Sequence, residues 1–180
     1  MLFRSLRADP SSSARCAARL QALGSGLKVG IAWRGGAVST RRTLRSMALL
    51  DLAPVFAVPG VRFVSLQHDA DEREIAEAST QCGVDIRHWP EILRDFDESA
   101  ALVASLDLVI TVCTATVHLA GALGCPAWVM VPAVAEWRYM AQGETMPWYS
   151  SVRMVRQQES GRWEPVIAAI AAELARKAGA

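Results

Sequence analysis

Residues 108–124 read LVITVCTATVHLAGALG. The apolar run at the start of this segment predicts a buried strand over 107–112, because the strands of a parallel sheet are covered on both faces. Two hydroxyl residues, Thr114 and Thr116, then precede a run of small residues, which predicts a capped helix over 114–123. We therefore expect a strand, a tight turn and a helix, which is the repeating unit of α/β proteins.

The same alternation of strand and helix runs through the rest of the chain. Further strands are predicted over 27–33, 61–66, 84–89, 126–131 and 152–156, and further helices over 11–23, 47–58, 70–81, 99–106 and 163–177. The expected N-caps are one of Ser11, Ser12 and Ser13 for the first helix, and Asp97 for the helix over 99–106.

Strands joined by helices of this length need crossover connections, which favour a parallel sheet with helices on both faces. We predict an α/β fold with a single Rossmann-like, doubly wound domain over 27–180, preceded by a linker helix in residues 1–26. Its mainly parallel sheet should have about six strands. The strand over 107–112 should be central, because it is almost wholly apolar.

Composition and charge exclude several classes of protein. Hydrophobic residues make up 52% and charged residues 21% of the 180 residues, which is too apolar for an intrinsically disordered chain. The formal net charge of +1 argues against bulk attraction to nucleic acid or to anionic lipid. Glycines, prolines and polar residues interrupt the longest apolar stretch, 108–135, so we expect no membrane span.

The four cysteines are far apart in the sequence and include no CxxC pair; they are Cys16, Cys82, Cys113 and Cys125. Zinc sites and redox dithiols usually carry such pairs, so we expect reduced thiols that act as small hydrophobic side chains and no bound metal. The first ten residues have no apolar signal core. We therefore expect a cytoplasmic protein without disulfide bonds.

Ligands of doubly wound sheets bind beyond the carboxyl ends of the strands, where the strand order reverses. We therefore expect the functional residues in three loops: 34–45, 67–71 and 113–118. In the last loop, Thr114 and Thr116 lie at a helix start whose N–H groups and dipole favour an anion. His118, one turn further on, is placed to reach the same anion. From spacing alone, the alternative is a purely structural helix in which His118 makes its hydrogen bonds within the protein and binds no ligand.

The loop over 34–45 combines two glycines with four arginines: Gly35, Gly36, Arg34, Arg41, Arg42 and Arg45. Glycines let a backbone approach a ligand closely, and one arginine can donate two parallel hydrogen bonds to the oxygens of a phosphate. The loop matches neither a Walker motif nor GxGxxG, so a solvated basic turn is the alternative. No motif for covalent catalysis is present in the sequence.

Aromatic residues gather near 136–149, where Trp137 and Trp148 are candidates to stack on a base or a sugar. For Trp148 and Trp163, packing of the last helix on the sheet is the favoured interpretation.

Residues 28–36, 45–46, 59–67, 94–96 and 107–126 together resemble the C-terminal, donor-binding half of a GT-B glycosyltransferase. The resemblance is greatest to the heptosyltransferase-like domain of family nine that follows tetratricopeptide repeats in many bacterial proteins. It extends over about 2–174, and its most specific parts are 114–123 and 65–67. It implies one half of a GT-B fold that binds a nucleotide-diphosphate sugar for transfer to an acceptor hydroxyl, without a metal or another cofactor.

The resemblance also implies roles for individual residues. The loop that carries Arg34, Gly35, Arg42 and Arg45 would face the diphosphate or the acceptor, Gln67 would lie near the nucleotide, and Thr114, Thr116 and His118 would contact the diphosphate. Cys113 would face the donor as a substrate-binding residue, but it stands where the family has an aspartate, and a thiol cannot replace the hydrogen bonds of a carboxylate. For this reason we assign no catalytic residue.

GT-B enzymes form their active site between two halves, so the implied partners are the donor and an acceptor-side domain or a tetratricopeptide-repeat region. Two other functions stay open. Cys113 favours a degenerate, non-catalytic binding or interaction module, and the third candidate is a nucleotide-sugar epimerase-like half. By itself, the chain is expected to bind a ligand rather than to catalyse transfer.

Overall fold

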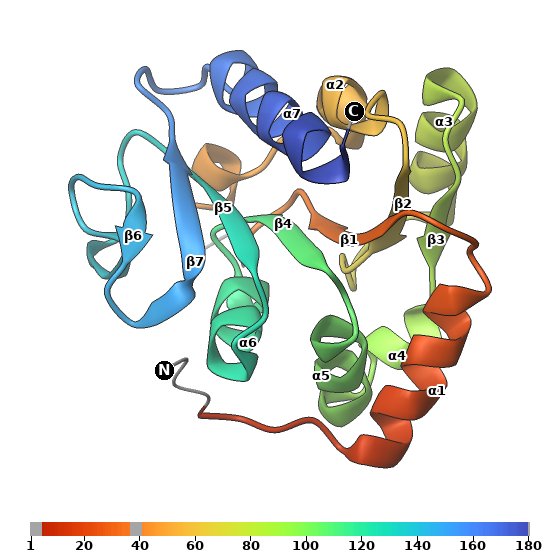
Figure 1. The fold of residues 1–180 in the computed structure, drawn as a ribbon. Helices are drawn as coiled ribbons and strands as arrows, with labels where there is room; N and C mark the ends of the chain where they lie inside the picture. The colour runs from red at the N-terminus through yellow and green to blue at the C-terminus, as the bar shows by residue number, and fades with distance from the viewer. Residues whose placement is uncertain (1–4, 37–40, 180) are drawn as a thin grey trace.

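The computed structural model describes residues 5–36 and 41–179. Within these residues the strands form one seven-stranded sheet in the order β3-β2-β1-β4-β5-β7-β6 (Figure 1). The strands are β1 (Leu27–Ala32), β2 (Val61–Ser65), β3 (Ile86–His88), β4 (Leu108–Val112), β5 (Ala127–Val131), β6 (Thr145–Met146) and β7 (Tyr149–Arg156).

Helices cover both faces of this sheet, as predicted (Figure 1). The α-helices are α1 (Pro10–Gln21), α2 (Ala53–Phe56), α3 (Glu72–Cys82), α4 (Pro90–Leu93), α5 (Phe96–Ala104), α6 (Ala115–Leu123) and α7 (Glu164–Ala178). The 3-10 turns are η2 (Arg42–Arg45), η3 (Leu49–Leu52) and η4 (Trp137–Tyr139). Helices α2, α3 and α7 enclose one apolar core, and α1, α5 and α6 enclose the other.

The topology confirms a mainly parallel, doubly wound sheet with β4 at its centre. All strand pairs are parallel except β6 with β7. The chain runs outward from β1 through β2 to β3, then returns to place β4 on the other side of β1. Strand order therefore reverses between β1 and β4. The seventh strand, β6, is only two residues long, and no hydrophobic alternation predicts it.

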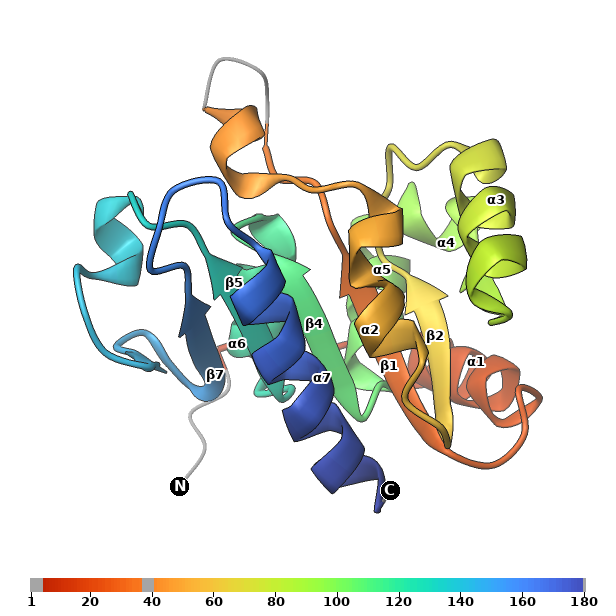
Figure 2. The same ribbon diagram turned by 90° about the horizontal axis from the view of Figure 1, so that it is seen from above.

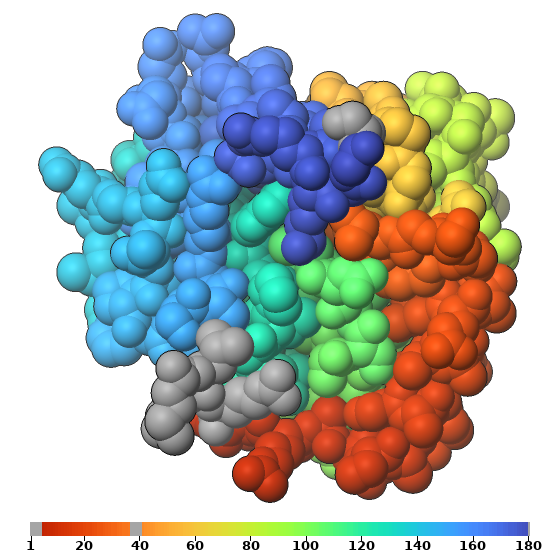
Figure 3. Space-filling view, in the orientation of Figure 1, coloured from red at the N-terminus to blue at the C-terminus, as the bar shows by residue number. Residues whose placement is uncertain are grey.

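The N-terminal helix lies against the body of the domain. Cys16 and Leu20 of α1 are buried in the same core as residues of α5. In Figure 3 the red-orange N-terminal segment packs against the neighbouring residues without a visible gap. Its N-cap is Asp9, which accepts a hydrogen bond from the backbone of Ser12, so the prediction of a serine cap is wrong. Pro10 at the first helical position needs no N–H partner, which favours this start.

Two other helix predictions need correction. Asp95, rather than Asp97, caps α5, because its carboxylate accepts from the backbone N–H groups of Asp97 and Glu98. The single helix expected over 47–58 is instead η3 followed by the one-turn α2. Pro54 lacks the N–H that a continuous helix would donate to the Leu50 carbonyl, so one turn ends before it and a separate turn begins.

The loop predicted over 34–45 contains η2 at its end, and residues 37–40 of that prediction lie outside the described part of the chain. Cys16, Cys82 and Cys113 are reduced thiols, and the Cys125 thiol donates to the Val103 carbonyl at 3.2 Å, so no disulfide bond forms among the described residues, as expected. In residues 5–36 and 41–179, every helix is too short or too polar to cross a membrane.

Candidate functional site

A hollow of about 190 Å³ opens at the point where strand order reverses. The chain leaves β1, β2 and β4 at the same edge of the sheet, because these strands are parallel. The turn over 41–46 lies beyond that edge (Figure 2). The described residues that line the hollow are Ala32, Arg34, Gly36, Arg42, Leu66, Gln67, His68, Asp69, Thr114, Ala115 and Thr116. All three predicted loops therefore meet in one place.

The start of α6 forms one wall of this hollow. Thr114 is the N-cap, and its hydroxyl accepts a hydrogen bond of 3.1 Å from the backbone N–H of Thr116. Its oxygen also lies 3.4 Å from the hydroxyl of Thr111 in β4. Ala115 is exposed, so the positive end of the helix dipole reaches the hollow. This arrangement favours a negatively charged ligand.

The arginines of the opposite wall are already paired with carboxylates of the chain. Arg34 contacts both oxygens of Glu74, at 2.7 and 2.6 Å. Arg42 donates to Asp69 at 2.6 Å. These contacts hold the guanidinium groups beside the hollow. They also mean that a bound anion must share the two arginines with Glu74 and Asp69 or displace those carboxylates.

Gln67 lines the hollow, but its amide group serves the loop after β1. The side-chain oxygen accepts from the backbone N–H groups of Trp33, at 3.1 Å, and Arg34, at 2.9 Å. Its nitrogen donates to Asp69. Burial by itself raises the pKa of Asp69, but hydrogen bonds from Gln67 and Arg42 outweigh this effect and hold the pKa below its usual value. Asp69 is therefore negatively charged at neutral pH.

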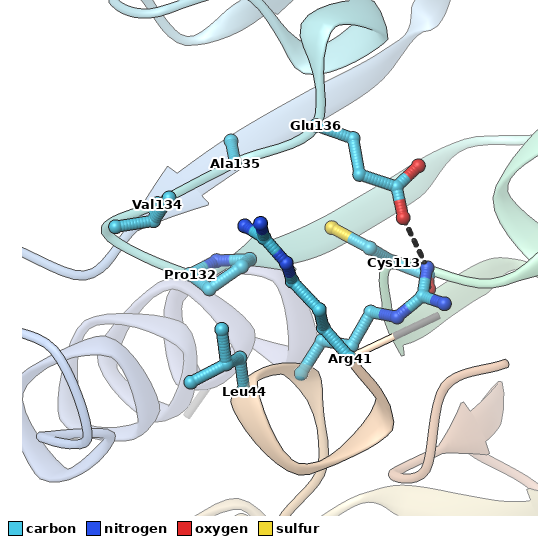
Figure 4. Close-up of a pocket in the computed structure, with 8 residues that line it drawn as sticks. Arg41, Leu44, Cys113, Pro132, Val134, Ala135 and Glu136 are labelled. Carbon is cyan, nitrogen blue, oxygen red and sulfur yellow. Dashed lines mark hydrogen bonds and ion pairs between the residues drawn. The ribbon is translucent and has the colours of Figure 1, made fainter. Parts of the chain in front are cut away.

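A second hollow, of about 260 Å³, lies beyond the ends of β4 and β5 (Figure 4). Its described lining is Arg41, Leu44, Arg45, Cys113, Pro132, Val134, Ala135 and Glu136. The guanidinium group of Arg41 projects into it (Figure 4). One nitrogen of Arg45, Nη1, donates both to the Cys113 carbonyl at 3.2 Å and to Glu136 at 2.7 Å. This pairing joins the loop after β1 to the loop after β5.

Gly35 allows the loop after β1 to lie close to β4. An added Cβ would stand 2.8 Å from the Cys113 carbonyl oxygen and 3.1 Å from that of Arg45, which is too close for a side chain. The backbone N–H of Gly35 also donates to the Ser46 hydroxyl at 3.1 Å. The glycine is therefore needed for contact with the chain's own backbone.

Cys113 and His118 are both held by contacts inside the domain. Cys113 is 2% exposed, and burial raises the pKa of its thiol to about 12, so it stays protonated. The His118 ring lies 6.3 Å from the Tyr139 ring and 5.8 Å from the Tyr149 ring, between centroids. Burial and the nearby Arg138 lower its pKa. Neither of the two hollows includes His118 in its described lining, so the structure does not bring it together with Thr114 and Arg42.

A third hollow, of about 290 Å³, adjoins the first one on the α5 side. The two share Leu66, His68, Ala115 and Thr116. The third hollow is otherwise mainly apolar, and Phe96 on its rim is 64% exposed. Sequence reasoning included His68 and Asp69 only as members of the loop over 67–71, and it gave no role to Phe96 or Glu136. An aromatic residue directly after Asp95, a residue type that often caps helices, was a signal that could have indicated this site.

The aromatic residues near η4 divide as follows. Trp163 is buried beside α7, as predicted. Trp148 is 52% exposed and Trp137 is 75% exposed, and their rings meet edge to face at 6.0 Å. The prediction that Trp148 packs between the last helix and the sheet is therefore wrong. Its indole N–H donates instead to the Arg138 carbonyl at 2.9 Å, which holds the 137–148 segment together.

Solved structures with a similar fold include the glycosyl transferase family 9 protein from Veillonella parvula DSM 2008. Its TM-score is 0.66 at 13% sequence identity, with 98% of this chain and 53% of that chain covered. The fold is that of one GT-B half. The E. coli ADP-heptose LPS heptosyltransferase II gives a TM-score of 0.62 at 13% identity, covering 98% of this chain and 54% of the enzyme. The chain thus spans about half the length of these proteins.

A curated protein is similar in sequence to this GT-B half. Protein FlbA of Caulobacter vibrioides (strain ATCC 19089 / CIP 103742 / CB 15) is 39% identical over 173 residues, which cover 94% of this chain and 28% of FlbA. No protein-family model matches the chain. The chain therefore shares its fold with family 9 glycosyltransferases and its sequence with a limited part of a longer protein.

Proposed function

We propose that the chain is the donor-binding half of a glycosyltransferase and binds a nucleotide-diphosphate sugar at the reversal point of its sheet. The observation that carries this proposal is the first hollow, where the start of α6 faces Arg34 and Arg42. The positive end of a helix and two guanidinium groups are suited to a diphosphate. The similarity of the fold to family 9 glycosyltransferases supports the same assignment.

The neighbouring third hollow suits the nucleoside. Its apolar lining, with Phe96 exposed on the rim, offers a surface for a base, and it shares Ala115 and Thr116 with the proposed diphosphate site. A nucleoside diphosphate would therefore extend from Phe96 toward the start of α6. Transfer to an acceptor hydroxyl would need an acceptor-side domain, since this chain spans about half of its structural neighbours. We also propose a tetratricopeptide-repeat region as a partner. We propose a cytoplasmic location as well, which the reduced state of the cysteines supports.

During transfer, the role of this half would be to stabilise the departing diphosphate. Charge grows on the phosphate oxygens as the bond to the sugar breaks, and fixed N–H groups and guanidinium groups lower the energy of that state. Thr114 holds the first turn of α6 in place through its cap, and Gln67 positions the backbone of Arg34. Both are positioning residues.

The test is calorimetric titration with UDP, ADP and GDP and with the corresponding glucose-bearing nucleotides. We expect one nucleoside diphosphate to bind, and Arg42→Ala to weaken its binding at least tenfold through loss of a charged hydrogen bond. Arg62→Ala is the matched control, because Arg62 is exposed on β2 and lies outside all the described hollows. Absence of binding at millimolar nucleotide, or equal effects of the two substitutions, would contradict the proposal.

A non-catalytic binding module is the second candidate. The pairing of Arg34 with Glu74 and of Arg42 with Asp69 favours it, because both cations are satisfied within the chain. So does the protonated thiol at position 113. The same titration separates the two candidates, since a module that has lost its donor site would bind none of these nucleotides.

A further inference from the structure

The loop that follows β5 places a carboxylate beside the end of β4, next to Cys113. β4 and β5 are parallel, with Val112 opposite Met130, so the two chain segments leave the sheet at the same edge. The loop after β5 then carries Glu136 into the hollow that Cys113 lines. Figure 4 shows the Glu136 carboxylate and the Cys113 side chain in this one hollow. Among the described residues that line it, Glu136 is the only one with a carboxylate.

Two arginines hold this carboxylate in a defined position. One oxygen accepts from Arg45 at 2.7 Å, and the other accepts from Arg138 at 2.6 Å. The same Arg45 nitrogen also binds the Cys113 carbonyl, so Glu136 is fixed beside the end of β4. Its side chain is about one-third exposed. Each carboxylate oxygen has more than one acceptor site, so both can still accept a hydrogen bond from a ligand.

The rest of the hollow suits a sugar ring. Leu44, Pro132, Val134 and Ala135 form an apolar wall, and the carboxylate stands at its edge. A sugar presents C–H groups on its faces and hydroxyl groups around its rim, which match these two kinds of surface. Hydrogen bonds from hydroxyls to an ionised carboxylate are roughly twice as strong as those between neutral groups.

The position of the hollow also fits. It and the proposed diphosphate site lie on either side of the η2 turn, which supplies Arg42 to one and Arg45 to the other. The strand end at Cys113 and Thr114 likewise contributes one residue to each. In a nucleotide-diphosphate sugar, the sugar is bonded directly to the second phosphate, so its site must adjoin that of the diphosphate.

We infer that Glu136 binds the sugar hydroxyls of the donor in the hollow lined by Cys113, and so determines the preference of the site for a sugar-bearing nucleotide. This inference rests on the proposed binding of a nucleotide-diphosphate sugar. It assigns to the loop after β5 a task that the first residue after β4 cannot perform, because a protonated thiol is a poor acceptor.

The experiment is calorimetry on the Glu136→Gln protein with the nucleoside diphosphate that the wild type binds and with its glucose-bearing form. We expect the affinity for the sugar-bearing ligand to fall about tenfold, while the affinity for the bare nucleoside diphosphate changes less than about twofold. Glu144→Gln is the matched control, since Glu144 is an exposed carboxylate that also pairs with an arginine, Arg153. It should change neither affinity.

A Glu136→Asp protein keeps the charge and should recover part of the preference, and melting temperatures of all variants establish that they fold. The inference is overturned if Glu136→Gln weakens both ligands equally, which would show that Glu136 only holds Arg45, or if it weakens neither. In both of these cases the wild type still binds the nucleoside diphosphate. If the wild type binds neither ligand, the proposed function fails as well.

Discussion

Replacement of Gln67 by leucine should destabilise the domain, and by more than replacement of the other buried glutamine, Gln157. Gln67 is 8% exposed, and its oxygen accepts from two backbone N–H groups, those of Trp33 and Arg34. Leucine fills a similar volume but accepts no hydrogen bond, so both donors lose their partner. A buried donor without a partner costs about 1–3 kcal/mol.

Because the Arg34 donor is only partly buried, we take about 1.5 kcal/mol for each of the two groups and expect a loss of about 3 kcal/mol in the free energy of unfolding. For a domain of this size, 1 kcal/mol corresponds to about 2–4 °C in melting temperature. Gln67→Leu should therefore melt about 6–12 °C below the wild type. The assay is thermal and urea denaturation followed by circular dichroism.

Gln157→Leu is the matched control. Gln157 is also buried, at 5% exposed, but its oxygen accepts a single, longer bond of 3.3 Å, from the backbone of Ala133. Its nitrogen has no partner among the described residues. Its replacement should cost about 1 kcal/mol or less. The reasoning is refuted if Gln67→Leu is no less stable than Gln157→Leu, or if it lies within about 0.5 kcal/mol of the wild type.

Four other outcomes are expected. Gly121→Ala should destabilise the protein by about 2 kcal/mol, because the new Cβ would stand 2.2 Å from a ring carbon of Tyr149; helix propensity alone predicts a gain of about 1 kcal/mol, so a stabilised variant in urea denaturation would show that the contact relaxes freely. Cys113→Asp should lower stability by about 2 kcal/mol or more, since a carboxylate replaces a thiol that is 2% exposed; an unchanged melting temperature would contradict this. Asp69→Asn should tighten nucleoside diphosphate binding roughly fivefold, because it removes a negative charge beside Arg42, and weaker binding in the titration would assign Asp69 to the ligand instead. Burial and Arg138 hold the pKa of His118 below its ordinary 6.5 in the folded state, so the unfolded chain binds a proton first as the pH falls; the stability that neutral His118 contributes is therefore present above about pH 6.5 and declines below it, and His118→Phe should reduce the difference between urea denaturation at pH 7.5 and 5.5.

The predictions that held are those in which neighbouring residues supply the whole signal. The run from Leu108 to Val112 is apolar except for Thr111, which is typical of a strand covered on both faces, and it is the central strand. Thr114 caps α6 through a hydrogen bond that spans two residues. The meeting of three loops followed from strand direction, because parallel strands bring their carboxyl ends to one edge.

The wrong predictions concern choices between similar local signals. Asp95 and Asp97 are both good cap residues, and the turn that ends α4 decides between them, since the Asp95 N–H donates to the Ile92 carbonyl. Apolar spacing over 47–58 suggested one helix, although Pro54 interrupts its hydrogen bonds. Trp148 was assigned to packing by its type alone, whereas the 137–148 segment turns it outward.

Short-range patterning therefore determined the order of strands and helices, the sheet that they form and the edge at which a ligand would bind. Tertiary structure alone decided what the polar side chains at that edge do. Arg34, Arg42 and Arg45 find their partners 40, 27 and 91 residues away in sequence, at Glu74, Asp69 and Glu136. Gln67 is used by a loop 33 and 34 residues before it. A hydrogen bond depends on distances of about 3 Å between atoms, and such distances across separate strands exist only once the sheet has brought those strands together.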